Sequence, residues 1–600
     1  MQVGRLIWEH MSFIKKHRSK IYFIIFLTVT ILTHYFWLTQ YIKYPRMDEG
    51  HYFTLSREIY TEYNTSGTLP ALKMAYMRKH WKPILHPVLA APFFIFAGGN
   101  SLLALTYYLC FIYAIFLMVI YIYLKRYLNA EMTLMGLLTT TCIPWISGTM
   151  IGFNSEFTFI TASLSFFVIT ENLKDLSSIS KTLTISLCLF FMFALRPVEA
   201  ALLFSTSIIF FTVQFFLRNL ISKIDLVFIA TSLGILAALL ATPYFIIHRE
   251  WSVETSTIFL VAYVAYVFLF HQMAIKKKLT LSTNVLLGTA LFNVLSLAWY
   301  LPSANTLLHW ILLTNLGDMA KELGQRLGVS DFIFISNYLK SFGAVCLVFA
   351  ILFLINFNLR NFKKLIGYAL SLLVIPLFFG YISYNGDMRY YIAGWAVIFL
   401  LLFSMSLRIK NRFSILSATV SSLVLIILFV HSKHVPYKFE LAGLSFEGYI
   451  GRSNWFYDKS KSDKSIVAFY NKLSPEIMKS NDYIKMKMFL NDRDFTYEYF
   501  IDRHVLEILA SEDGKKIFIE KELYSTSKLN FYDLDYVLIG PVDINSKYDS
   551  YENFINSFSK SCEIGKEIHA DIGSLALKFK KHIDYERQGK VDRFCLFEKI

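Results

Sequence analysis

The sequence predicts an α-helical multi-pass membrane protein with a small C-terminal α/β domain, and three observations lead to that fold class. Of the 600 residues, 55% are hydrophobic and 17% are charged, whereas a typical soluble chain carries roughly 25% charged residues. Apolar runs of membrane-spanning length recur as far as His431, and residues 432–600 have the composition of a soluble domain. Soluble domains stop growing near ~250–300 residues, so a wholly soluble chain would need several domains with ordinary polar surfaces.

A spanning helix needs about 20 mostly apolar residues, and the chain contains about thirteen such segments. They are predicted at 21–41, 103–124, 132–150, 157–172, 182–195, 198–217, 224–247, 255–272, 283–302, 336–357, 366–384, 390–407 and 413–431. The two segments around Arg196-Pro197 can also form one broken or re-entrant element.

The formal net charge of +15 is unevenly distributed. Residues 432–600 hold 26 Lys and Arg against 27 Asp and Glu, so the membrane part carries all of the excess. A basic soluble surface that would bind nucleic acid is therefore excluded, and loop charge in a membrane protein remains.

The orientation follows from Lys and Arg in short loops, which favour the cytoplasmic side. With the N-terminus inside, the cytoplasmic segments hold twenty of these residues and the short outer loops hold five. The predicted parts are a cytoplasmic basic N-terminus (1–20), a transmembrane core (21–431) with a first extracytoplasmic loop (42–102), and an extracytoplasmic domain (432–600). The expected location is a bacterial plasma (inner) membrane.

The six cysteines show no metal-binding spacing. Four of them lie within apolar spans, where Cys behaves as a small hydrophobic residue. Cys562 and Cys595 lie in the exported part, so a disulfide between them is permitted, although sequence does not show that they meet. The sequence contains no Walker loop, HExxH or GxSxG motif.

Two adjacent carboxylates follow the first span directly, in the segment Tyr44-Pro-Arg-Met-Asp48-Glu49-Gly-His-Tyr52. Ionisable groups at this depth are costly and usually have a function. Asp48 and Glu49 point in different directions on a regular backbone, so one can act while the other anchors. The alternative is a solvated pair that opens a helix.

Further ionisable residues recur at the predicted outer ends of spans. Lys82 and His86 stand beside two prolines that break the helix. Glu156 opens the fourth span, Arg196 sits at a helix break, and Arg389 opens the twelfth. Each residue alone is explained by a loop charge or a snorkelling side chain. Together they place acids and bases from five segments at one interface, where a membrane-bound anionic substrate would be held.

These segments resemble membrane glycosyltransferases of the GT-C class, in particular the lipid A aminoarabinose transferase and protein O-mannosyltransferase group. The motifs that carry the resemblance are Asp48-Glu49 with Tyr52 and Ser56-Arg57-Glu58, Lys82-Pro83 before a Phe-Gly-type turn, Arg196-Pro197, and Asp387-Met388-Arg389-Tyr390-Tyr391. The helix number and the exported C-terminal domain are also similar. The chain departs from the pattern at Ile84, where a second proline is usual, and at Pro197, where glycine is usual.

The resemblance implies transfer of a sugar from a polyprenyl-phosphate donor to a lipid, glycan or protein hydroxyl at the outer face. Asp48 is the expected general base, and Glu49 orients substrate with Glu156. The expected phosphate-binding residues are Lys82, His86, Arg196 and Arg389. No cofactor is assigned, and a divalent cation is left open, with Asp48, Glu49 and Glu156 as its candidate ligands.

Two alternatives stay open. A transporter or flippase of lipid-linked saccharide would carry charges near the bilayer midplane and a repeated half, and a glycan polymerase or ligase would usually place its chemistry in a large late loop. In the exported domain, strands are expected at 516–520 and 536–541 and amphipathic helices at 465–479 and 494–511.

Overall fold

The computed structural model describes two sets of residues. The N-terminal set is 2–40, 47–77, 83–141, 150, 152–153, 155–171, 178–197, 200, 280–303 and 306. The C-terminal set is 438–441, 444–447, 465–477, 483–490, 503–513, 516–521, 535–540, 568–570, 575–587 and 590–599. Apart from Ala200, seven of the predicted spans lie outside the described residues: 198–217, 224–247, 255–272, 336–357, 366–384, 390–407 and 413–431.

The other six predicted spans coincide with helices. They are α1 (Gln2–Gln40), α6 (Ser101–Leu124), α7 (Ala130–Thr141), α9 (Ser155–Glu171), α10 (Ile179–Leu195) and α14 (Thr280–Tyr300). Two described stretches are long and apolar enough to cross a membrane, Arg18–Phe36 within α1 and the whole of α6. The remaining helices are shorter. Helix α7 is described as far as Thr141, and residues 142–149 of the predicted span 132–150 lie outside the described residues.

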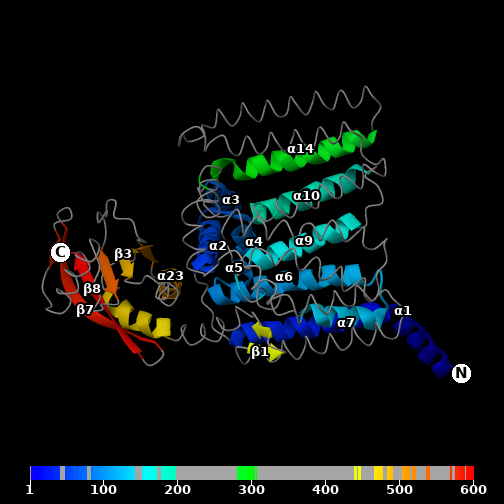
Figure 1. The fold of residues 1–600 in the computed structure, drawn as a ribbon, viewed down its shortest axis with the longest axis horizontal. Coiled ribbons are helices and arrows are strands. Elements are labelled where there is room, and N and C mark those ends of the chain that lie inside the picture. Colours follow the sequence, from blue (N-terminus) through cyan, green and yellow to red (C-terminus); the bar gives the residue numbers. More distant parts are fainter. Residues whose placement is uncertain are drawn as a thin grey trace. The chain divides into compact units, whose positions relative to one another are not determined.

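The directions of these helices follow from contacts along their lengths. Stacked rings of Phe23 and Tyr121 have centroids 4.0 Å apart, and those of Tyr35 and Tyr107 are 6.3 Å apart, so α1 and α6 are antiparallel. Tyr123 of α6 contacts Phe167 near the end of α9, with centroids 5.5 Å apart. Near the beginnings of the two helices, Tyr108 Oη of α6 lies 3.0 Å from Thr158 Oγ1 of α9. Helices α6 and α9 therefore run parallel (Figure 1).

Helices α10 and α14 also run parallel, and they pack closely at a glycine. A Cβ atom built on Gly288 would lie 2.4 Å from Thr182 Cγ2 and 2.8 Å from Ser186 Oγ. Small residues allow helix backbones to approach in this way inside a membrane. Nearer the ends of the two helices, Tyr300 Oη donates to the carbonyl oxygen of Phe193 at 2.6 Å.

Four short helices form the described part of the first loop. They are α2 (Met47–Ser66), α3 (Thr68–Met77), α4 (Leu85–Ala90) and α5 (Pro92–Phe96). Gly67, between α2 and α3, has a φ of 90°, a left-handed conformation that glycine adopts without strain. The prolines act as the sequence suggests, since Pro83 lies before α4 and Pro87 lies in its first turn, where no intrahelical N–H is needed.

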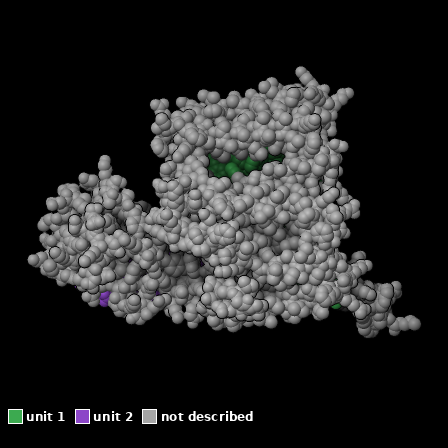
Figure 2. All heavy atoms as spheres, viewed as in Figure 1, with its two compact units in different colours: residues 1–36, 59–95, 106–453 green, residues 37–58, 96–105, 454–600 purple. Residues whose placement is uncertain are grey.

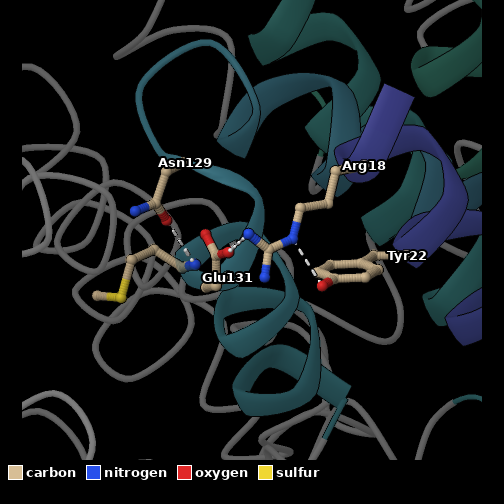
Figure 3. A network of polar contacts seen from close by, with 5 residues as sticks. Arg18, Tyr22, Asn129 and Glu131 are labelled. Carbon is tan, nitrogen blue, oxygen red and sulfur yellow. Dashed lines mark hydrogen bonds and ion pairs between the residues drawn. The ribbon is translucent and has the colours of Figure 1, made fainter. Parts of the chain in front are cut away.

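An exposed polar network joins α1 to α7 (Figure 3). Arg18 Nη1 lies 2.9 Å from Glu131 Oε1, and Arg18 Nε donates to Tyr22 Oη at 2.6 Å. Asn129 caps α7, because its Oδ1 accepts the N–H of Met132 at 2.9 Å. Glu131 therefore stands in the first turn of α7, where a negative charge is favourable.

The C-terminal part contains a six-stranded sheet in the order β4-β3-β5-β8-β7-β6. Its strands are β3 (Tyr483–Leu490), β4 (Lys516–Lys521), β5 (Tyr536–Gly540), β6 (Ile568–Ala570), β7 (Leu575–Arg587) and β8 (Lys590–Lys599). β3 pairs in parallel with both β4 and β5, and β8 pairs antiparallel with β5 and β7. A separate two-stranded sheet joins β1 (Lys438–Leu441) to β2 (Leu444–Glu447).

Two helices accompany this sheet, one over residues 465–477 and α23 (Arg503–Glu512). The first buries one apolar stripe, in which Ile466, Leu473 and Ile477 are 0% exposed. Strands β4 and β5 and both helices agree with the sequence expectation, although residues 494–502 lie outside the described part. Cys595 in β8 is disulfide-bonded, and Cys562, the partner that the sequence permits, lies outside the described residues.

The chain divides into two compact units, which Figure 2 distinguishes by colour. The first comprises residues 1–36, 59–95 and 106–453, and the second comprises residues 37–58, 96–105 and 454–600. All side-chain contacts of the candidate site described next lie within the first unit.

Candidate functional site

Polar side chains gather at one end of the helical bundle, which we call the Glu156 end. Here α6 and α9 begin and α10 and α14 end, as contacts between Tyr108 and Thr158, Glu156 and Arg196, and Tyr300 and Phe193 establish. These are the ends of the four spans that the loop charges assign to one side of the membrane. The folding of the bundle thus brings together segments that are up to two hundred residues apart.

Glu156 and Arg196 form an ion pair at this end. Arg196 Nη1 lies 3.4 Å from Glu156 Oε1, and the two side chains are 13% and 6% exposed. Local sequence explains both positions. Glu156 is in the first turn of α9, where a carboxylate is favourable, and Arg196 follows the last residue of α10, where a cation is favourable.

The end of α10 is set by Pro197. A residue that precedes proline is disfavoured in the α conformation, and Arg196 has φ −151° and ψ 88°. Its N–H still donates to the carbonyl oxygen of Met192 at 3.0 Å, so the break occurs directly after one complete helical hydrogen bond. The backbone of Arg196 is therefore bonded to α10, and its side chain is paired with Glu156 of α9.

His86 lies in a second buried polar group, at 1% exposure. Its Nδ1 is 3.0 Å from Tyr108 Oη and 3.2 Å from Thr158 Oγ1, and these two hydroxyl oxygens are 3.0 Å apart. The ring of Phe153 packs against the imidazole, with centroids 4.6 Å apart. Three elements, α4, α6 and α9, thus fix the orientation of one imidazole, and Nε2 lies on the opposite side of the ring.

Helix α9 connects the two polar groups. Thr158, which contacts His86, and Glu156, which contacts Arg196, are two residues apart in its first turns. The structure therefore brings together three of the seven residues expected from sequence: His86, Glu156 and Arg196. Phe153 packs against His86, and Phe157 and Leu195, which are adjacent in sequence to Glu156 and Arg196, are also at most 2% exposed.

The first-loop carboxylates open α2. Asp48 and Glu49 occupy its first turn, the position that a helix N-terminus favours for negative charge. Glu49 is partly exposed, and the side chain of Asp48 is among those that the structure leaves undescribed. Both residues belong to the second compact unit. Lys82 and Arg389 lie outside the described residues.

Two members of the site, Tyr108 and Thr158, are absent from the sequence expectation. Tyr108 is one of five tyrosines in the apolar helix α6, and helical periodicity does not separate the one that faces His86 from the other four. Thr158 lies two residues after Glu156, and this spacing does not indicate a shared site. A buried histidine nearby is the signal that would have pointed to both.

Tyr76 ties the first loop to the Glu156 end. Its hydroxyl group donates to the carbonyl oxygen of Ala298 near the end of α14. Burial raises the pKa of Tyr76 above its ordinary value, which keeps this hydroxyl protonated as a donor. Helix α3 is therefore anchored to α14 within the first unit.

A metal site is not apparent among the described side chains, since no group of three or more His, Cys, Asp or Glu residues is placed to hold an ion there. Glu156, one of the candidate ligands, has a guanidinium at 3.4 Å. A positive charge at that distance disfavours a cation at Glu156. The described geometry suits an anion at Arg196 better, and no step is assigned to a metal.

Two crystal structures of one protein are among the solved structures that match the chain. The chain is similar to the crystal structure of ArnT from Cupriavidus metallidurans bound to undecaprenyl phosphate, with 11% identity, a TM-score of 0.49, and coverage of 96% of this chain and 97% of that one. The apo structure of the same protein gives the same identity and coverage and a TM-score of 0.37. ArnT is the lipid A aminoarabinose transferase, one of the group that the sequence motifs resemble. No protein-family model and no curated protein sequence matches the chain.

Proposed function

We propose that this protein is a membrane glycosyltransferase that moves a sugar from a polyprenyl-phosphate carrier to a hydroxyl group of a lipid, glycan or protein. The observation that carries the proposal is the buried Glu156–Arg196 pair beside the His86 group, among described helices that are mainly apolar. Ionisable groups buried at the end of a membrane bundle are costly, and they usually mark the path or site of a polar substrate.

Arg196 suits the phosphate of such a carrier. A guanidinium presents five N–H donors in a planar fork, so it can serve a carboxylate and a phosphate in different directions. Its charge favours departure of the phosphate, because the leaving group gains negative charge as the bond to the sugar breaks. The apolar helix surfaces around it suit a polyprenyl chain.

His86 adds an oriented donor at the same end. The hydrogen bonds at Nδ1 fix the ring, so Nε2 has one direction in which to act. We assign it the role of a second phosphate contact, and we assign Lys82 and Arg389 to the same anion on sequence grounds alone.

The reaction is a single displacement. Asp48 takes the proton of the acceptor hydroxyl, the acceptor oxygen forms a bond to the anomeric carbon, and the bond from that carbon to the phosphate oxygen breaks. Polyprenyl phosphate leaves with the bonding electrons. Attack opposite the leaving group inverts the anomeric centre. Glu49 and Glu156 orient the substrates.

We place the protein in a bacterial inner membrane, with the N-terminus in the cytoplasm and the reaction on the opposite face. Nucleotide sugars are cytoplasmic, so a transferase on that face needs a lipid-linked donor.

The test compares surface glycans and lipid A by mass spectrometry in cells with the gene, without it, and with single variants. Deletion should remove one sugar modification, and Asp48→Asn should reduce it about 100-fold or more because a general base contributes on that scale. Glu62→Gln, on the same helix α2, is the matched control and should retain the modification. An unchanged glycan profile with altered uptake of a solute would instead support a transporter.

A further inference from the structure

Helix α14 carries an uncharged polar strip that no role above uses: Asn293, Ser296 and Trp299. Residues three apart are neighbours on a helix surface, so the three side chains form one row. Asn293 and Ser296 are 0% exposed, and the indole Nε1 of Trp299 is buried although its ring is partly exposed. Trp299 packs edge-on against Phe190 of α10, with ring centroids 6.0 Å apart.

Ser296 differs from three other buried serines and threonines in the described helices of the bundle. Thr161, Ser163 and Ser186 each donate to the carbonyl oxygen four residues earlier, at 2.9, 2.7 and 2.9 Å. Among the residues that the structure describes, Ser296 Oγ and Trp299 Nε1 have no hydrogen-bond partner. Buried polar groups are nearly always hydrogen-bonded, so two neighbouring exceptions indicate that a ligand supplies the partners.

The strip lies at the Glu156 end. Tyr300 bonds to Phe193, which is three residues before Arg196, and Tyr76 bonds to the carbonyl oxygen of Ala298. Ser296 is four residues from Tyr300, about 6 Å along the helix axis. The strip is therefore on a helix whose end is fixed beside the end of α10 that carries Arg196.

The chemistry of the strip fits a sugar ring. Serine hydroxyl and asparagine amide groups donate and accept, as sugar hydroxyls do, and an indole offers one N–H donor beside a flat apolar face. The strip holds no charge, so it does not suit a phosphate, and an acyl or isoprenoid chain would leave Ser296 Oγ and Trp299 Nε1 without a hydrogen-bond partner.

We propose that Ser296 and Trp299, with Asn293, bind the hydroxyl groups of the sugar on the glycosyl donor. This inference rests on the proposed function, in which Arg196 holds the donor phosphate. In this arrangement Arg196, paired with Glu156, contacts the donor phosphate, and the strip on α14 contacts the donor sugar. The opposing explanation is that Ser296 is only a small residue that lets α14 pack closely, as is common between membrane helices.

The experiment measures binding to the full-length protein in nanodiscs by native mass spectrometry. The probes are undecaprenyl phosphate alone and the same carrier loaded with glucose, mannose, arabinose or an aminopentose. Wild type should bind at least one loaded carrier more tightly than the bare one. Ser296→Ala and Trp299→Phe should reduce that preference about tenfold each, the effect of losing one well-formed hydrogen bond, without changing the Kd of bare undecaprenyl phosphate.

Ser163→Ala is the matched control, because Ser163 is equally buried but its hydroxyl is satisfied within α9. It should bind every probe as wild type does. Variants of Ser296 and Trp299 that keep the full preference, or that weaken bare and loaded carriers equally, would overturn the sugar site, as would a wild type with no preference for any loaded carrier. A wild type that binds no carrier at all would instead count against the proposed function itself.

Discussion

Two ion pairs among the described residues of the bundle lie at opposite ends of its helices, and they differ in what surrounds them. The Arg18–Glu131 pair is the shorter, at 2.9 Å, but both side chains are about half exposed. The Glu156–Arg196 pair is longer, at 3.4 Å, and its side chains are 6% and 13% exposed. Water and salt screen the first pair, whereas the second has lost most of its hydration and depends on its partner. Burial, and not the distance between the charged atoms, therefore decides which pair contributes more to stability.

The largest effect is expected from breaking the buried pair. Arg196→Ala leaves the Glu156 carboxylate buried without its cation, which should cost about 3–5 kcal/mol of stability and lower transfer about 100-fold or more. Thermal melts in detergent and the glycan assay measure the two quantities.

The double variant Glu156→Gln/Arg196→Met separates structure from function. Removing both charges should recover most of the melting temperature, since no buried charge is left unpaired, but transfer should stay lost. If the double variant regained transfer, the pair would be structural only.

The next effect concerns the packing that holds the end of α10. Gly288→Ala places a methyl group 2.4 Å from Thr182 Cγ2, which should cost about 1–3 kcal/mol by overpacking. Gly67→Ala is an informative companion, because there the added methyl meets no atom within 4 Å but the φ of 90° is strained. A melting temperature for Gly288→Ala at or above that of the wild type would show that α10 and α14 can separate without cost.

Tyr108→Phe should have an effect on stability of similar size. It removes the hydroxyl that His86 Nδ1 and Thr158 share while keeping the ring that packs against Phe93 and Phe153. Loss of one buried hydrogen-bond partner costs about 1–3 kcal/mol. We expect transfer to fall with a changed pH profile, because Thr158 alone then holds His86 Nδ1 and the ring is less firmly oriented. Tyr123→Phe, in the same helix, should leave the pH profile as in the wild type.

The smallest effect is expected at the exposed pair. Arg18→Ala removes the contacts to Glu131 and Tyr22, but solvent already screens this charge. Its melting temperature should match that of the wild type within error, at low and at high salt. A large loss, comparable with that of Arg196→Ala, would contradict the importance given to burial.

Sequence was sufficient where local chemistry decides the structure. The apolar run of α6 predicts its 24 residues almost to the residue, and Arg196-Pro197 marks the end of α10. In the C-terminal domain, the short β-branched and aromatic runs at Lys516 and Tyr536 predict β4 and β5. In each case the signal lies in neighbouring residues.

Sequence was insufficient where the partner lies far along the chain. Nothing local connects Glu156 with Arg196, forty residues later, or shows that Gly288 meets Thr182. An apolar membrane helix is hydrophobic all round, so its pattern does not say which face meets which helix. Tyr108 and Ser296 became recognisable only when their surroundings were known, because their chemistry depends on which atoms are within reach.

The length of helix α1 has a mechanical consequence. Its 39 residues correspond to about 58 Å, nearly twice the ~30 Å hydrocarbon thickness of a bilayer. The stretch suited to the membrane starts at Arg18, so the preceding turns form a stiff arm of about 24 Å. A probe fixed near its tip would report the tilt of α1 as a lever does, with small rotations at the membrane becoming large displacements at the tip.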